Sequence, residues 1–306
     1  MHGNSFEFID NILKEITSLV EMNITHCCVN AISENLKLLT LLVTFNLSHN
    51  DIVILPEQIG RCLAITELNL SHNQLCKLPI SIGRLKHVIN VRLDHNNLSY
   101  LTPEIGGVPE VYGMTGWINC KNLNLSHNPL TLLVPTLCGL TSLEILRLKN
   151  CDRLQNPPKE ILKGGINHIW KYLQQFRDGL SDAIPSVRIS GWGLESIPNC
   201  WHIYGDVQAL DLADNLISTL QNFEMLSDLT SLKLSGNPIG VLQPFISNFS
   251  KMKVLMLENI SCQFFPAEIL SLVELTSLKL DFNIKLNRIP KRVRTDSHVN
   301  FSTFTH

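Results

Sequence analysis

A short pattern, LxxLxLxxNxL, recurs along the whole chain and restricts its fold more than any other feature of the sequence. The pattern aligns eleven times, and most copies follow one another at intervals of 22 or 23 residues. Its Asn position falls at residues 27, 50, 73, 96, 128, 151, 192, 215, 237, 260 and 283. Repetition at this period is typical of solenoids, because a single repeat cannot bury its own apolar face and must stack on its neighbours.

The spacing within the pattern predicts the local structure. Alternate side chains of a strand point to opposite faces, so the two leucines of LxL face a core and the residue between them faces outward. We therefore expect one parallel sheet along a concave face, with strands centred on residues such as 45–47, 68–70, 91–93, 210–212 and 232–234. The Asn should turn inward and bond backbone groups where the chain leaves each strand.

Four copies of the pattern have another residue at the Asn position. Cys27 and Cys151 stand there in two copies, and Trp192 and Ile260 in two others. The side chains of Trp192 and Ile260 cannot form the hydrogen bonds of an amide. We expect the chain to leave these two strands differently.

Several repeats continue with a second motif, LPxxIG, as in residues 55–60 and 78–83. With both motifs, the chain resembles intracellular leucine-rich-repeat proteins over about residues 4–290, including the suppressor-of-clear type scaffold of Ras signalling. The resemblance implies an α/β solenoid of horseshoe shape, with a parallel concave sheet and about eleven repeats. It also implies recognition or scaffolding in signalling, but it carries over no particular partner. The kind of partner we expect is an acidic protein, a small GTPase or a phosphatase.

Two long intervals interrupt the array. The first has its excess residues around 106–113, where Gly and Pro predict a loop. In the second, five apolar residues recur at helical spacing: Ile166, Ile169, Trp170, Leu173 and Phe176. They predict a helix whose apolar face packs on the array, with a partner groove as the alternative. The expected organisation is a half repeat or N-terminal cap at 1–18, a front array at 19–156, an inserted helical segment at 157–182, a back array at 183–290 and a polar tail at 291–306.

The interruption and the N-terminus both bear on whether the chain is a piece of a larger protein. Residues 156–165, running into Tyr172 and Leu173, resemble the segment that closes such arrays and that precedes the GTPase in Roco proteins. Asn4 lies 23 residues before Cys27, so the first half repeat keeps the register of the array. This register favours a fragment of a longer protein over a purpose-built N-terminal cap.

Composition and motif searches exclude several classes of function. A net charge of −2 argues against a polybasic surface for nucleic acid. The sequence contains no phosphate-binding loop, zinc-protease motif, nucleophile elbow or kinase motif, so we predict neither an enzyme nor a cofactor. The first ten residues lack the basic and apolar regions of a secretion signal, and the nine cysteines are scattered, which together predict a cytoplasmic protein. No apolar run is long enough to span a membrane.

The outward position of the strands is rich in amides at the front of the array and cationic further along. Candidate partner-binding residues are Arg92, Arg147, Lys149, Arg188, Lys233 and Lys279. They predict a docking surface for an acidic partner, with a merely solvated face as the alternative. Nucleic acid is not expected, since the cations occur once per repeat without aromatic stacking residues.

A histidine occupies one position in five consecutive repeats, at residues 26, 49, 72, 95 and 127. Because neighbouring strands lie about 4.8 Å apart, these rings should form a ladder beside the sheet. A pH sensor or a metal-binding strip would use such a ladder. Ser-His-Asn is also a common repeat consensus, and only Asp94 could complete a coordination set, so no metal site is predicted.

The function favoured by the sequence is a non-catalytic protein-binding module or scaffold in intracellular signalling. One alternative is the regulatory repeat region of a larger Roco-type GTPase or kinase. The other is an extracellular recognition receptor, which eight N-x-S/T sequons would suit. Four of those sequons, at Asn23, Asn46, Asn69 and Asn124, arise from the repeat itself.

Overall fold

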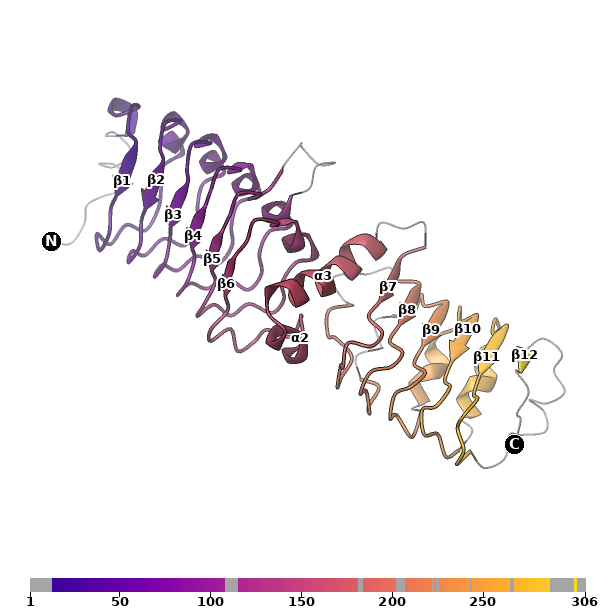
Figure 1. Cartoon of the computed structure of the whole chain (residues 1–306). Helices are drawn as coiled ribbons and strands as arrows, with labels where there is room; N and C mark the ends of the chain where they lie inside the picture. The colour runs from indigo at the N-terminus through magenta and orange to yellow at the C-terminus, as the bar shows by residue number, and fades with distance from the viewer. Residues whose placement is uncertain are drawn as a thin grey trace. The chain divides into compact units, whose positions relative to one another are not determined.

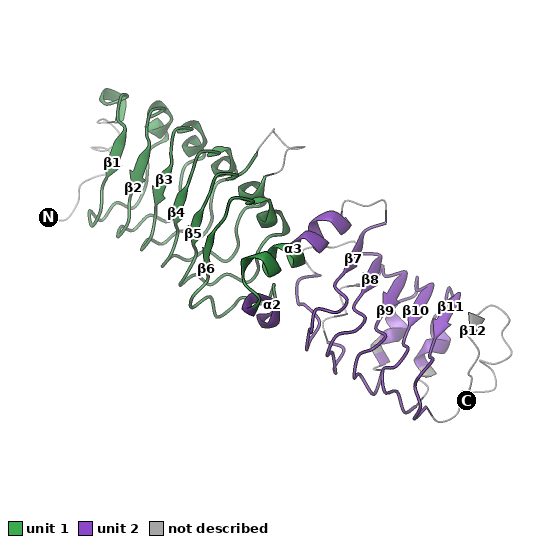
Figure 2. Ribbon diagram, in the orientation of Figure 1, with its two compact units in different colours: residues 1–157, 164–173 green, residues 158–163, 174–306 purple. Residues whose placement is uncertain are grey.

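The computed structural model describes residues 13–107, 115–180, 184–201, 207–221, 223, 226–242, 244–264, 267–286 and 300–301. The chain forms two compact units (Figure 2). The first consists of residues 1–157 and 164–173, and the second of residues 158–163 and 174–306. The loop expected at 106–113 and the half repeat expected at 1–18 lie largely outside the described residues.

The first unit contains a parallel sheet whose strand order follows the sequence (Figure 1). Its strands are β1 (Glu21–Asn23), β2 (Thr44–Asn46), β3 (Glu67–Asn69), β4 (Asn90–Arg92), β5 (Asn122–Asn124) and β6 (Ile145–Arg147). Each strand pairs with the next at the same position of the repeat, so that Phe45 lies opposite Leu68 and Leu68 opposite Val91. The sequence period therefore becomes an in-register stack of strands.

The second unit contains a second parallel sheet. Its strands are β7 (Ser186–Arg188), β8 (Ala209–Asp211), β9 (Ser231–Lys233), β10 (Val254–Met256), β11 (Ser277–Lys279) and β12 (Asn300–Phe301). The parallel strands of the predicted solenoid are present, but they form two sheets where one was expected. The chain between β6 and β7 contains two helices, so no strand continues the first sheet one repeat after β6. Strand β12 was not predicted. It lies within residues 291–306, which were expected to be a polar tail, and it pairs with β11.

Short 3-10 helices form the opposite side of the repeats. They are η1 (Glu34–Leu38), η2 (Glu57–Arg61), η3 (Ile80–Arg84), η4 (Pro103–Gly106), η5 (Pro135–Gly139), η6 (Pro244–Asn248) and η7 (Ala267–Ser271). The motif LPxxIG explains η3: Pro79 precedes it with φ of −67°, an angle that its ring enforces. Gly83 lets η3 and η4 pack closely, because a Cβ at this position would lie 2.5 Å from the carbonyl oxygen of Glu104.

In the repeats that have a 3-10 helix, the core lies between this helix and the strand. In the third repeat, Leu68 and Leu70 contribute to the core from the side of the strand. Ile82 and Leu85 contribute from the side of η3, and all four residues are buried. The outward residues of the strands remain at least partly accessible, as the alternation predicted.

Buried asparagines link each repeat to the one before it, as the sequence predicted. Oδ1 of Asn50 accepts hydrogen bonds from the backbone N–H groups of Cys27 and Val29, each at 3.0 Å. Its Nδ2 donates to the carbonyl oxygens of Ile24 and Leu47, at 2.7 and 2.9 Å. Equivalent bonds are made by Asn73, Asn96, Asn128, Asn215, Asn237 and Asn283.

The strand exits change at three of the four positions that lack this amide, whereas the exit at Cys151 keeps the usual form. In every repeat the residue before the Asn position has a left-handed backbone, for example His49 with φ of 57°. After Trp192 and Ile260 a second left-handed residue follows, Gly193 with φ of 68° and Ser261 with φ of 60°. The different exits expected at Trp192 and Ile260 are therefore confirmed, and Cys27 has the same form, with Cys28 at φ of 53°.

Two α-helices, α2 (Lys159–Lys163) and α3 (Ile166–Leu180), occupy the second interruption. The apolar spacing correctly predicted α3, and Ile169, Leu173 and Phe176 are buried. Ile166 and Trp170 are only half-buried. Tyr172, which was not among the five apolar residues that predicted the helix, is fully buried. This burial supports packing of the apolar face within the protein, as favoured over a partner groove.

Candidate binding surfaces

The outer face of the first sheet changes in character toward β6. Strand pairing places Asn69, Arg92, Asn124 and Arg147 in one column across β3 to β6. Nε of Arg92 lies 3.6 Å from Oδ1 of Asp94, two residues further along the same strand direction. The charge of Arg92 is therefore partly balanced from within its own repeat.

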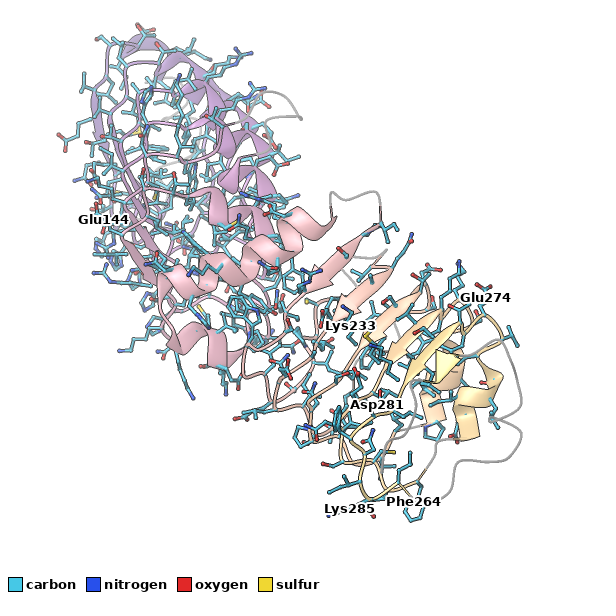
Figure 3. The ribbon with its side chains drawn as sticks, turned by 45° about the vertical axis from the view of Figure 1, so that its right-hand side comes forward. Glu144, Lys233, Phe264, Glu274, Asp281 and Lys285 are labelled. Carbon is cyan, nitrogen blue, oxygen red and sulfur yellow. The ribbon has the colours of Figure 1, made fainter. Side chains whose placement is uncertain are left out.

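The residues Ile145, Arg147 and Lys149, here called the β6 patch, alternate along β6 and its continuation. All three are exposed, so the patch combines two cations with an apolar side chain. Among the described residues neither Arg147 nor Lys149 forms an ion pair. The neighbouring acid, Glu144, projects into solvent (Figure 3) and is held by Lys121 at 3.1 Å.

The outer face of the second sheet has cations that are matched by acids. Asp211 on β8 lies between Arg188 on β7 and Lys233 on β9. Its Oδ2 is 3.9 Å from Nε of Arg188 and 3.4 Å from Nζ of Lys233. Lys279 on β11 lies 3.9 Å from Oε1 of Glu258. This face therefore carries little uncompensated positive charge.

The six predicted partner-binding residues thus fall on two sheets. Arg92, Arg147 and Lys149 share the first, whereas Arg188, Lys233 and Lys279 share the second. The sequence showed Asp211 in the same outward column, but the prediction did not consider that it would neutralise both of its neighbours. It also missed Ile145, which the alternation of β6 places on the outer face beside Arg147.

The five histidines form a continuous stack, as the shared repeat position predicted. Ring centroids of successive residues His26, His49, His72, His95 and His127 lie 4.3, 4.1, 4.0 and 3.9 Å apart, with interplanar angles of 11° to 16°. We call this stack the histidine ladder. Asn150 continues its column and places Nδ2 3.3 Å from Nδ1 of His127. All five histidines have φ between 54° and 57°, so the same turn orients every ring.

The ladder has one acidic neighbour among the residues that precede its histidines. Asp94 precedes His95, and its Oδ2 lies 3.2 Å from Nδ1 of that ring. Burial lowers the pKa of His72, and His95 and His49 on either side lower it further. The centre of the ladder therefore favours uncharged imidazole more than an isolated histidine does.

The cysteines differ widely in environment. None of the nine forms a disulfide. Burial raises the pKa of the Cys62 and Cys120 thiols to about 12. Cys27, Cys28 and Cys76 are exposed.

In the described part of the chain, no helix has both the length and the apolar character needed to cross a bilayer.

Comparison with known proteins identifies leucine-rich repeats within the chain. The family model of the leucine-rich repeat matches residues 64–85 and 119–140. No curated protein matches the chain. Among solved structures, a leucine-rich-repeat protein of Leptospira interrogans is 20% identical with a TM-score of 0.33, covering 96% of this chain and 98% of that chain. The functional domain of InlJ from Listeria monocytogenes, described as including a cysteine ladder, is 14% identical with a TM-score of 0.40, covering 94% and 60%. An internalin, InlF, from the same species is 15% identical with a TM-score of 0.31, covering 98% and 94%.

Proposed function

We propose that this chain, which has the leucine-rich-repeat fold, is a non-catalytic module that binds an acidic protein partner through the outer face of its first sheet. The proposed docking site is centred on the β6 patch, that is, Ile145, Arg147 and Lys149. Proteins with leucine-rich repeats generally mediate protein–protein interactions, and the proposed role is that of a scaffold in intracellular signalling. Nine scattered cysteines without a disulfide support a reducing compartment for this role.

The observation that carries the proposal is the difference between the two sheets in charge balance. Arg147 and Lys149 are exposed and form no ion pair among the described residues, whereas Asp211 and Glu258 pair with the cations of the second sheet. Unpaired surface cations accelerate the association of an acidic partner and fix its orientation. The β6 patch is therefore the better candidate of the two faces.

The composition of the β6 patch also suits a protein ligand. The side chain of Ile145 is 41% exposed, and it lies two residues from Arg147 on the same outer face of β6. An apolar side chain that loses water on binding, next to an Arg that can pair bidentately, is typical of the residues that dominate interface energies. The backbone of β6 is already paired with β5 in the free protein, which reduces the ordering that binding requires.

The test is an affinity capture with quantitative mass spectrometry, using the full chain as bait. Arg147→Glu with Lys149→Glu should lose the specifically retained acidic partner, because two attractive charges become repulsive. The matched control, Arg188→Glu with Lys233→Glu, makes the same charge change on the second sheet and should retain that partner. Binding of the purified partner should weaken as salt is raised for the wild-type chain and show a flatter salt dependence for the first variant. An unchanged set of captured proteins in the first variant would move the site elsewhere, for which residues 157–180 are the next candidate.

A second function, the regulatory repeat region of a larger Roco-type GTPase or kinase, is favoured by one observation. The segment at 156–165, which resembles the one that precedes the GTPase in such proteins, directly follows the first array, contains α2 and leads into α3. Transcript sequencing beyond both ends of the present chain decides this alternative, since it requires a GTPase or kinase domain in the same reading frame. The extracellular receptor suggested by the sequons requires glycosylation, which a change in gel mobility after deglycosylation would reveal.

A further inference from the structure

Two imidazoles and a carboxylate meet at one point of the histidine ladder. His72, Asp94 and His95 each place one ligand atom within 4.8 Å of those of the other two. Oδ2 of Asp94 and Nδ1 of His95 are 3.2 Å apart. Two ligands of a tetrahedral zinc ion, with bonds near 2.0 Å, are separated by about 3.3 Å. We propose that His72, Asp94 and His95 bind a divalent transition-metal ion such as Zn²⁺.

The donor set selects the class of ion. Imidazole nitrogen and carboxylate oxygen together suit Zn²⁺, Co²⁺ and Ni²⁺, whereas Ca²⁺ and Mg²⁺ prefer oxygen ligands alone. Three protein ligands leave at least one coordination position for water or for a donor group of a ligand. The site is thus of the open kind. Its ligands lie just after two neighbouring strands of the first sheet, His72 after β3 and Asp94 and His95 after β4.

The carboxylate of Asp94 is an independent indication of a missing cation partner. Its side chain is only 6% exposed, yet Oδ1 receives no hydrogen bond from any described residue. Its nearest cation is Nε of Arg92, at 3.6 Å. Leaving a buried carboxylate oxygen without a donor is costly, and a metal ion that binds both oxygens of Asp94 would satisfy Oδ1 together with Oδ2.

The neighbouring repeats show that this carboxylate is a departure from the local pattern. Ser48, Ser71 and Ser126 precede His49, His72 and His127, so three ladder repeats have Ser where the fourth has Asp94. The first has Thr25. The ladder therefore contains four positions without an acid that serve as internal controls for the one with it.

Binding requires a small rearrangement, which gives the proposal a structural signature. The rings of His72 and His95 are 16° from parallel and 4.0 Å apart. An imidazole nitrogen binds a metal in the plane of its ring, so at least one ring must rotate about its Cβ–Cγ bond and leave the stack. Solvent access permits this, because the His95 side chain is 39% exposed and that of Arg92, which must move aside, is 56% exposed.

The experiment is a titration of the metal-free full chain with Co²⁺, read by visible absorption, followed by displacement with Zn²⁺. Three variants isolate the site: Asp94→Ser, His95→Asn and, as the matched control, His26→Asn at the far end of the ladder. Ser recreates the Ser-His-Asn sequence of three other repeats, and Asn tolerates the left-handed backbone that Asn150 already adopts in this column. All three variants should therefore fold, which circular dichroism verifies.

We expect saturable Co²⁺ binding to the wild-type chain, weakened at least about tenfold by Asp94→Ser and by His95→Asn, and unchanged by His26→Asn. Zinc should shift the imidazole NMR signals of His72 and His95 while leaving those of His26 in place. Absence of saturable binding to the wild-type chain overturns the proposal. Equal affinities of the wild-type chain and Asp94→Ser also overturn it, since any binding then belongs to the ladder as a whole.

Discussion

The hydroxyl of Tyr172 donates a hydrogen bond of 2.8 Å to Oδ1 of Asn156, and both side chains are fully buried. Within the first unit this bond joins α3 to the loop that follows β6. Tyr172→Phe leaves the amide oxygen without its donor and should lower the free energy of unfolding of this unit by about 1–3 kcal/mol. Urea denaturation measures the change. Tyr100→Phe, at a half-exposed position, is the control and should have almost no effect; equal losses in both variants would contradict this role.

The buried asparagines should contribute more than any surface amide. Nδ2 of Asn73 donates to the carbonyl oxygens of Leu47 and Leu70, and its Oδ1 accepts from the N–H of Ile52. Asn73→Ala leaves several buried backbone groups unpaired, so we expect a loss of about 3 kcal/mol or more in the free energy of unfolding. Asn97→Ala, at an exposed position, should change it by less than about 0.5 kcal/mol. Comparable denaturation midpoints for the two variants would show that the hydrogen bonds of the buried Asn73 side chain are not needed for stability.

Thiol reactivity should separate the cysteines into two groups. Because the thiolate is the reactive form, a pKa of about 12 leaves a fraction on the order of one in ten thousand at pH 8 for Cys62 and Cys120. Iodoacetamide at this pH should label exposed Cys76 in the folded protein and label Cys62 and Cys120 only after denaturation. Peptide mass spectrometry of native and denatured samples reads the outcome. Labelling of Cys62 at the rate of Cys76 in the native sample would contradict its burial.

Removing one acid should leave two cations of the second sheet without their ion-pair partner. Asp211→Asn leaves Arg188 and Lys233 without the carboxylate between them, so binding of a polyglutamate peptide should strengthen at low salt. Fluorescence anisotropy of a labelled peptide measures the affinity. Glu274→Gln makes the same change in net charge at an exposed residue outside the strands (Figure 3) and serves as the control. If both variants strengthen binding equally, the change in net charge alone accounts for the higher affinity, and the position of Asp211 between the two cations does not matter.

Local features of this fold could be predicted because they depend on residues within one repeat or at fixed positions of the adjacent repeat. The strand at β3 follows from the alternation of Leu68 and Leu70, and the bonds of Asn50 follow from the need to pair backbone groups at a strand exit. The separation into two sheets depends on whether a strand follows β6 at the next repeat position, which the pattern LxxLxLxxNxL does not encode. The neutralisation of Lys233 by Asp211 lay in the sequence register, but its strength depends on side-chain distances that only the structure provides.

The proximity of His72 to Asp94 could be predicted from the sequence only in part. The repeat period predicted that neighbouring histidine rings would stack, and Asp94 was visible beside one of them. Its burial and its orientation toward His95 depend on how the side chain settles against the adjacent repeat. A sequence pattern fixes which positions are neighbours, whereas the atoms that are left without partners emerge from packing.

The thiol of Cys151 at the last Asn position of the first array has a consequence for local opening. Its Sγ replaces one bond of the amide by donating to the carbonyl oxygen of Leu125 at 3.3 Å. In Asn50 and Asn128, Oδ1 also accepts a hydrogen bond from a backbone N–H of the preceding repeat. A thiol accepts hydrogen bonds only weakly, so Cys151 cannot replace this second bond. Strand β6, which carries Arg147, should therefore exchange its amide hydrogens faster than β2 to β5, and a bound partner should slow that exchange most at β6.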